Sequence, residues 1–309
     1  MSRHATGSAP GKIILLGEHS VVFGEPAIAA AIDRRLEVSL RVGGEPAMPS
    51  DSRIERAVVL AATDLGVDAN DLSVEITSDI PPACGLGSSA AFSLALVRAL
   101  ASLADRTLSA EDVRRRASRV EDVFHGTASG VDVAASAEGG VVWFERADPP
   151  RLERLRPGKP LELVVALSGE VRSTAGPVSR LRARHAARPD LYGRFFRLAG
   201  DLVRSGREAL TSGDLEAFGQ LMDAAQGLLN AFGVSTPTLE RMIGIARGAG
   251  ALGAKLSGAG GGGAIIALAP AGGGTIVRDL REAGFEAFPT RIDRDRREDE
   301  DDRSNRRSA

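Results

Sequence analysis

Hydrophobic residues along the chain repeat with two spacings, every second residue or every three to four residues. Apolar or alternating runs predict strands at 9–16, 36–42, 72–77, 141–145, 161–167, 264–269 and 285–292. Helical spacing predicts helices at 50–66, 90–103, 109–124, 129–139, 239–247 and 275–283, and a helical region at 176–229 with turns near Pro189 and Gly213. Because strands and helices alternate in both halves, the pattern indicates an α/β or α+β fold with two lobes.

Composition narrows the class of protein. The 309 residues are enough for one large or two medium domains. A formal net charge of -2 gives no overall attraction for nucleic acid or an anionic membrane, so neither is expected as a partner. The single cysteine, Cys84, excludes an internal disulfide framework and favours a reducing compartment. No apolar run of about 18 residues predicts a membrane span, so we expect a soluble, cytoplasmic protein.

Glycine is concentrated in three segments, at 7–24, 85–89 and 248–263. The second opens an apolar helix and fits the loose G-x-G-x-x-G/A pattern, in which backbone amides and a helix N-terminus approach phosphate oxygens. Six loop residues separate it from the preceding strand, and no acidic residue ends a following strand, which disfavours a Rossmann site. The Walker pattern is absent. The segment therefore indicates a phosphate-binding loop of another type, or a glycine-rich helix start without a ligand.

Two carboxylates, Glu121 and Asp132, are separated by a helix end and a turn. Phosphoryl transfer uses a metal ion held by oxygen ligands and a carboxylate near the attacking hydroxyl. Each residue also has a structural explanation, because Glu121 shares a charged helix face and Asp132 completes a capping box that begins at Ser129. Spacing alone favours these structural explanations.

Lys12 lies within the first apolar strand, where burial of its charge requires an anionic partner. Asp132 or a substrate carboxylate can supply that partner. Glu18 and His19 come at the turn after this strand, which either faces a substrate or lies on the surface. The segment 255–263 reads Lys-Leu-Ser-Gly-Ala-Gly-Gly-Gly-Gly and is followed at once by an apolar strand. Ordering its five glycines costs conformational entropy, and we expect close backbone approach to a ligand to offset it.

Taken in order, these segments resemble the GHMP kinase superfamily, named for galactokinase, homoserine kinase, mevalonate kinase and phosphomevalonate kinase. The motifs that carry the resemblance lie at 9–24, 80–91, 125–132 and 255–263. Residues 171–174 and 229–237 bring the chain closest to the mevalonate kinase branch, and the resemblance covers about residues 9–290. The family usually has Asn-Pro where this chain has Thr127-Ala128, just before the aspartate segment.

The resemblance implies a fold and a division of the chain. The expected fold is α+β and two-lobed, with a left-handed βαβ crossover in the N-terminal lobe and a ferredoxin-like C-terminal lobe. The ATP-binding N-terminal lobe is expected at 1–175, the C-terminal lobe at 176–292 and a charged, disordered tail at 293–309. A homodimer is common in the family.

The resemblance also implies an activity and roles for individual residues. The expected reaction is the ATP- and Mg²⁺-dependent phosphorylation of mevalonate on its 5-hydroxyl, giving 5-phosphomevalonate for isoprenoid biosynthesis. Asp132 and Lys12 are expected to be catalytic, and Ser89 and Glu121 to hold Mg²⁺. Contacts to mevalonate are expected from Lys12, Glu18, His19, Asp132 and Thr174. Contacts to the nucleotide are expected from Pro82, Gly85, Leu86, Gly87, Ser88, Ser89, Ala90, Gly258, Ala259 and Gly260.

Several other functions fit the same motifs. One is phosphomevalonate kinase, for which Arg172 is the one obvious additional basic residue near the acceptor. Others are a homoserine or sugar kinase, and an enzyme acting at the 3-hydroxyl, such as a mevalonate 3-kinase or mevalonate diphosphate decarboxylase. A nucleotide-binding protein without catalysis is the alternative of a different class. The presence of all the expected catalytic and metal-binding residues argues against it.

Overall fold

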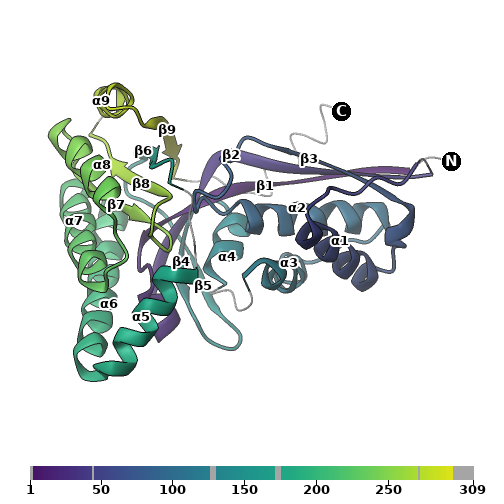
Figure 1. Ribbon diagram of the computed structural model, residues 1–309, viewed down its shortest axis with the longest axis horizontal. Helices are drawn as coiled ribbons and strands as arrows, with labels where there is room; N and C mark the ends of the chain where they lie inside the picture. The colour runs from purple at the N-terminus through teal and green to yellow at the C-terminus, as the bar shows by residue number, and fades with distance from the viewer. Residues whose placement is uncertain (1–2, 44, 126–129, 171–174, 271, 295–309) are drawn as a thin grey trace.

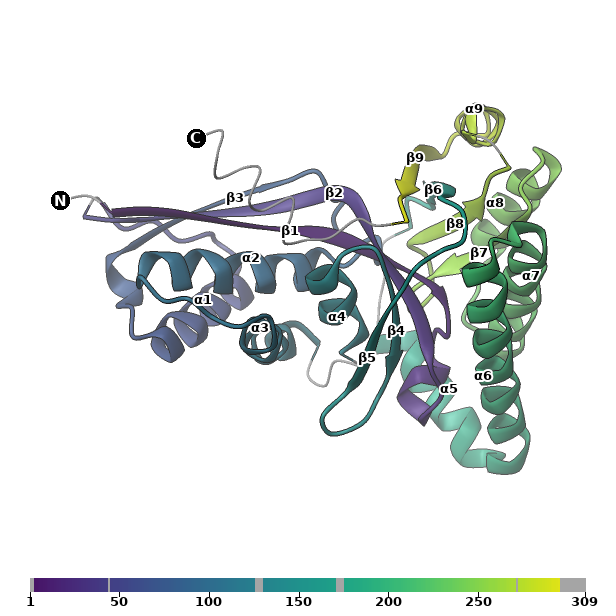
Figure 2. The same cartoon turned by 180° about the vertical axis from the view of Figure 1, so that it is seen from behind.

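The computed structural model describes residues 3–43, 45–125, 130–170, 175–270 and 272–294. It is an α+β structure with two sheets, each covered by helices (Figure 1). The first lobe and the helices α5 to α8 lie at opposite ends of the molecule, as the view from behind also shows (Figure 2). Among the described residues, no helix is long and apolar enough to cross a membrane. The expected two-lobed α+β architecture is confirmed.

The first sheet is built around a long antiparallel ribbon of two strands. The strands are β1 (Arg3–Leu16), β2 (Ala27–Val42), β3 (Leu72–Ser78), β4 (Val141–Glu145) and β5 (Arg151–Leu155). Their order is β1-β2-β4-β5, and β3 also pairs with β2. Residues 36–42 of β2 pair with β3, whereas residues 27–30 pair with β4. The strand β2 thus pairs along one edge with β3 in its second half and with β4 at its start.

Helices cover one face of this sheet (Figure 1). They are α1 (Ser52–Leu65), α2 (Ser88–Leu103), α3 (Ala110–His125) and α4 (Val131–Glu138). The helix α2 packs against both β1 and α3 and is buried along nearly its whole length, because alanines on several sides allow close approach. Its N-terminus is therefore fixed against β1, and this contact positions the glycine-rich loop.

The second sheet has the strand order β7-β8-β6-β9, with antiparallel neighbours. Its strands are β6 (Leu161–Leu167), β7 (Gly253–Ser257), β8 (Ala264–Leu268) and β9 (Glu286–Ile292). The helices of this lobe are α5 (Ala175–Ala187), α6 (Pro189–Ser212), α7 (Leu215–Phe232), α8 (Pro237–Gly248) and α9 (Gly274–Glu282). Helices connect β6 to β7 and β8 to β9, so the chain path and strand order are those of a ferredoxin-like lobe, as expected.

The strands differ from the predicted ones at several places. The strand β2 begins at Ala27 rather than at residue 36, and neither β5 nor β7 is among the predicted strands. Lys255 lies in β7, not in a loop. The strand β6 pairs with β8 and β9, so the second sheet begins at Leu161, upstream of the lobe boundary expected after residue 175.

Polar contacts join the two lobes near the end of β1. The backbone N–H of Ile14 donates a hydrogen bond to Ser257 Oγ at 2.9 Å. The hydroxyl of Thr290 in β9 donates to Asp33 Oδ1 in β2 at 2.8 Å. The end of β1 therefore lies where side chains of both lobes meet.

Candidate active site

The structure brings Lys12 and Asp132 into direct contact. Lys12 Nζ lies 2.9 Å from Asp132 Oδ1, and the two side chains are 2% and 31% exposed. Lys12 comes from β1, and Asp132 is the second residue of α4. The N-cap of α4 is Gly130, with no capping side chain, and Ser129 of the expected capping box lies outside the described residues. The lysine thus has the anionic partner that its position in an apolar strand requires.

The glycine-rich loop closes over Lys12. The backbone N–H of Lys12 donates to Leu86 O at 2.8 Å, and Lys12 Nζ donates to Gly85 O at 3.2 Å. Gly87 caps α2 with a φ of 76°, and a Cβ at this position would lie 2.7 Å from Lys12 Cγ. Glycine is needed at residue 87 for its left-handed backbone and for the space that the lysine occupies.

The first turn of α2 offers backbone amides at the end of this loop. The helix begins at Ser88, so its N-terminus carries partial positive charge suited to phosphate oxygens. Leu86 and Ala90 have their side chains in the core, so only their backbone can face a nucleotide. Ser88 and Ser89 are partly exposed, and Pro82 is exposed in the preceding loop. Leu86 and Ala90 can therefore offer a nucleotide only backbone groups, whereas Ser88 and Ser89 can also offer their side chains.

Glu121 and Ser89 also meet, across α3 and α2. Ser89 Oγ donates to Glu121 Oε1 at 2.8 Å, and Ser93 Oγ donates to Glu121 Oε2 at 3.3 Å. Glu121 is 1% exposed. The hydroxyl and carboxylate oxygens are hard donors of the kind that Mg²⁺ prefers. Among the described residues no group of three or more His, Cys, Asp or Glu side chains could hold a metal ion.

The second glycine-rich loop, residues 258–263, packs closely on the protein itself. Gly261 N–H donates to Val234 O at 2.8 Å, and Gly263 N–H donates to Ser168 Oγ at 3.0 Å. A Cβ at Gly260 would lie 2.1 Å from Val234 O. We expected ligand approach to explain the glycines of this loop, but contact with the chain after α7 accounts for Gly260.

His19 joins this loop to the first lobe. It lies between β1 and the short 3-10 helix η1 (Ser20–Phe23), and its Nε2 is 3.1 Å from Ala259 O. Because a carbonyl oxygen only accepts hydrogen bonds, Nε2 carries the proton of this bond. Ala259 is therefore the residue through which the second glycine-rich loop contacts the turn at His19.

Glu18 is buried in an ion pair between the two lobes. Its side chain is 1% exposed, and its carboxylate forms an ion pair with the fully buried Lys255. Burial raises the pKa of Glu18, opposed by the charge of Lys255. Burial likewise lowers the pKa of Lys255, opposed by the charge of Glu18. In this structure the Glu18 carboxylate is therefore enclosed between the lobes with Lys255 as its partner, and its contact with the acceptor stays a prediction.

Comparison with known families accounts for these motifs. Residues 52–140 match the GHMP kinases N-terminal domain, and residues 207–286 match the GHMP kinases C-terminal domain. The chain belongs to the GHMP kinase family. GHMP kinases are ATP-dependent, so this member transfers a phosphoryl group from ATP to an alcohol.

Among relatives, the GHMP kinase is 37% identical to the mevalonate kinase of Pyrococcus abyssi, with 96% of this chain and 97% of the relative covered. It is also 37% identical to the mevalonate kinase of Aeropyrum pernix, with 94% and 97% covered. Among solved structures, it resembles the L. major mevalonate kinase in complex with R-mevalonate, with a TM-score of 0.85, 33% identity and 95% and 97% of the two chains covered.

Three residues singled out in the sequence cannot be placed, and two contacts of the site residues were not predicted. Thr174 and Thr127-Ala128 lie outside the described residues. Lys255 and Ser93 of this GHMP kinase were not expected to contact the site residues Glu18 and Glu121. A signal for Lys255 existed, because it stands between Ala254 and Leu256 in a short apolar run, as Lys12 does in β1.

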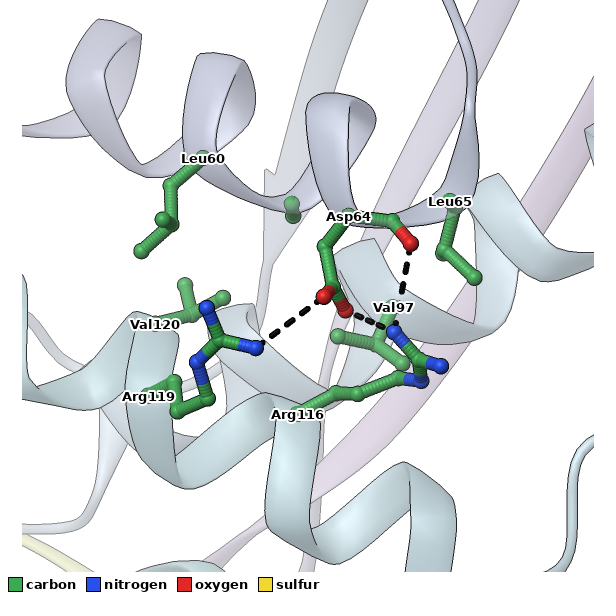
Figure 3. A pocket seen from close by; sticks show the side chains of 8 residues that line it. Leu60, Asp64, Leu65, Val97, Arg116, Arg119 and Val120 are labelled. Atoms are coloured by element: carbon green, nitrogen blue, oxygen red, sulfur yellow. Dashed lines mark hydrogen bonds and ion pairs between the residues drawn. The ribbon is translucent and has the colours of Figure 1, made fainter.

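A separate hollow lies between α1 and α3 (Figure 3). Asp64 of α1 forms ion pairs with Arg116 and Arg119 of α3, with 3.0 Å between Arg119 Nη1 and Asp64 Oδ1. The other residues that line the hollow are Leu60, Ala61, Leu65, Val97 and Val120. None of the residues expected to bind nucleotide, metal or acceptor lines it. These ion pairs fasten to α1 the helix that carries Glu121.

Proposed function

We propose that the chain phosphorylates mevalonate on its 5-hydroxyl, using ATP and Mg²⁺, to give ADP and 5-phosphomevalonate. The observation that carries the proposal is the Lys12–Asp132 ion pair directly beneath the glycine-rich loop at the start of α2. The choice of mevalonate is supported by the relatives named mevalonate kinase, one of them solved with R-mevalonate. The product would enter isoprenoid biosynthesis.

Asp132 has the geometry of the group that orients and deprotonates the acceptor. One carboxylate oxygen faces Lys12, and the side chain keeps about a third of its exposure, so the carboxylate can also reach a bound hydroxyl. The hydroxyl oxygen forms a bond to the γ-phosphorus, the bond from that phosphorus to the β–γ bridging oxygen breaks, and the hydroxyl proton passes to Asp132. Lys12 adds positive charge beside the transferring phosphoryl group.

Nucleotide and metal would be held at the N-terminal end of α2. The amides from Gly85 to Ser89 would bind phosphate oxygens, and the loop at 258–260 would approach them from the second lobe. Ser89 Oγ and the Glu121 carboxylate would hold Mg²⁺, whose charge neutralises the β- and γ-phosphates during transfer. These side chains come from adjacent helices, so the site is assembled by the packing of α2 on α3.

His19 is the described residue best placed to contact the acceptor. It lies in the turn that follows β1, the strand that carries Lys12, and its Nε2 is bonded to Ala259 O. Thr174 is proposed as a second contact on the basis of the family motif alone. Lys12 and Asp132 would complete the acceptor site at the reacting hydroxyl.

An acceptor panel tests this function. Purified protein with Mg-ATP is supplied in turn with mevalonate, 5-phosphomevalonate, galactose and homoserine, and ADP release is followed by a coupled assay. We expect turnover with mevalonate only. Turnover with another alcohol would keep the phosphoryl-transfer site and refute the substrate. A thermal shift with Mg-ATP but no turnover with any acceptor would instead support a nucleotide-binding protein without catalysis.

A further inference from the structure

A buried ion pair connects the two lobes beside the active site. Lys255 Nζ contacts the Glu18 carboxylate and donates to Leu256 O at 2.7 Å and to Ile14 O at 3.5 Å. The lysine belongs to β7 in the second sheet, whereas Glu18 and Ile14 belong to the first lobe. Ser257 adds to this junction by accepting from Ile14 N–H and donating to Ile14 O. The end of β1 is thus held by two side chains of β7, Lys255 and Ser257, which alternate along the strand and so share one of its faces.

The residue after Glu18 has a strained backbone. His19 has φ 62° and ψ -47°, a region that non-glycine residues rarely adopt. The N–H of Ser20 donates to Glu18 O at 2.7 Å, which closes a tight γ-turn centred on His19. Such a conformation persists only where surrounding contacts hold it. Two local hydrogen bonds to Gly17 O, from Val21 N–H and Ser20 Oγ, span the turn, and the ion pair of Glu18 with Lys255 ties its N-terminal side to the second lobe.

The strained turn sets the direction of the His19 imidazole. Its Nε2 binds Ala259 O, and its ring meets the Phe232 ring edge-on with centroids 6.4 Å apart. Both contacts are to the second lobe, as is the ion pair of Glu18. Lys255 of β7 therefore holds the backbone of the turn through Glu18, while Ala259 of the second glycine-rich loop holds the imidazole.

Stability alone does not explain a charged pair at this place. Enclosing two ionised side chains removes both from water, and well-packed apolar residues of similar volume are often as stabilising or more so. Burial opposes the ionised form of each partner, since it raises the pKa of Glu18 and lowers that of Lys255. The ion pair can hold the turn in one specific position, which apolar side chains would not do.

We propose that Lys255 is a positioning residue, which acts through Glu18 to hold the strained turn at His19 and so aims the imidazole at the acceptor. The part of this statement that concerns the acceptor rests on the function proposed above. The part that concerns the orientation of His19 does not, because it is a property of the protein without substrate.

The test compares Lys255→Met with a matched control, Gln226→Met. Gln226 is also buried and accepts a hydrogen bond from Leu256 N–H of the same strand, but it is bonded to neither Glu18 nor His19. The chain has only four histidines, so the imidazole resonances are few, and His19→Asn identifies the one from His19. Asparagine tolerates the positive φ of the turn.

The first readout is the imidazole spectrum of the protein without ligands. We expect Lys255→Met to shift and broaden the His19 resonance and to leave that of His4, which is exposed near the start of β1, in place, whereas Gln226→Met leaves both unchanged. Glu18→Gln, which keeps the volume of the side chain, should reproduce the effect of Lys255→Met and serves in its place if that variant does not fold. An unchanged His19 resonance in the folded variant would overturn the proposal.

The second readout is kinetic. We expect Lys255→Met to raise the KM for mevalonate about tenfold or more and to change the KM for ATP by less than about twofold. In the His19→Asn background, Lys255→Met should cause no further loss in kcat/KM. Losses that multiply in the double variant, or equal changes in Lys255→Met and Gln226→Met, would overturn the proposal. If the wild-type protein does not use mevalonate, the proposed function fails, and the imidazole spectra still decide the role of Lys255.

Discussion

Lys12 Nζ lies 2.9 Å from Asp132 Oδ1, and the lysine is enclosed while the aspartate stays partly open. This asymmetry separates the two roles. Lys12 is held by the strand, by Gly85 O and by its ion pair, so its charge is fixed in place. The Asp132 side chain stays partly exposed, so a hydroxyl group can approach its carboxylate.

The first prediction concerns the base. Asp132→Asn keeps the shape of the side chain but cannot accept a proton from the acceptor. We expect kcat to fall by about 100- to 10,000-fold, with the Kd for ATP little changed, because the nucleotide amides lie on α2. Steady-state kinetics and nucleotide titration measure the two quantities. Near-normal turnover would mean that Asp132 only stabilises the first turn of α4.

The second prediction concerns the metal. Ser89→Ala and Glu121→Gln should each raise the Mg²⁺ concentration needed for half-maximal activity, because the first removes a proposed oxygen ligand and the second removes the negative charge of another. Ser93→Ala is the control, since Ser93 also bonds to Glu121 but at 3.3 Å and from one turn deeper in the helix. We expect its Mg²⁺ dependence to stay close to that of the wild-type protein. An unchanged Mg²⁺ dependence in both ligand variants would refute the assignment.

The third prediction concerns the glycine-rich loop. Gly87→Ala places a Cβ 2.7 Å from Lys12 Cγ and also strains the left-handed backbone. Gly284→Ala strains a backbone of φ 91° in open space and serves as the control, with an expected cost of about 1–2 kcal/mol in the free energy of unfolding. We expect Gly87→Ala to cost more than this control and to lower kcat, because Lys12 must move. Urea unfolding and kinetics measure both effects, and equal costs without loss of kcat would show that the close contact is unimportant.

Much of the candidate site follows from local pattern. A lysine in an apolar strand demands an anion, and a glycine-rich segment before an apolar helix indicates a phosphate loop, so Lys12 and residues 85–90 are visible from the sequence. Asp132 and Glu121 are less so, because spacing alone also fits a cap and a charged helix face. The ordered resemblance of the motifs, rather than any one of them, separates these explanations.

Other parts of the fold depend on long-range contacts that local pattern does not contain. The start of β2 is a run of alanine and isoleucine, which favours helices as much as strands, and pairing with β1 and β4 decides its structure. The strand β5 is short and mostly charged at the edge of its sheet. Lys255 stands just before a loop with five glycines, so the sequence pattern does not reveal the strand that contains it. The enclosure of Glu18 follows from that same strand.

A fourth prediction concerns pH and the buried pair. Because the pKa of Glu18 is raised in the folded protein, its contribution to stability is present below pH 4.5 and is lost as the pH rises through the folded value. Because the pKa of Lys255 is lowered, its contribution is present above pH 10.5 and is lost as the pH falls through the folded value.

The double variant Glu18→Gln/Lys255→Met removes both titrations. The free energy of unfolding of the wild-type protein, measured relative to that of the double variant, should therefore be lowest between these limits and should rise toward either. Denaturant unfolding at a series of pH values measures this difference. A difference that does not vary with pH would show that burial shifts neither group.

The most direct test of the central claim is the position of the transferred phosphate. Mevalonate is incubated with the protein and Mg-ATP, and the product is examined by phosphorus NMR with proton coupling. A phosphate on a primary carbon couples to two protons, and we expect this signal, from 5-phosphomevalonate, with the wild-type protein and its near absence with Asp132→Asn. A phosphate on the tertiary 3-oxygen, which lacks such coupling, or no phosphorylated mevalonate at all, would contradict the account.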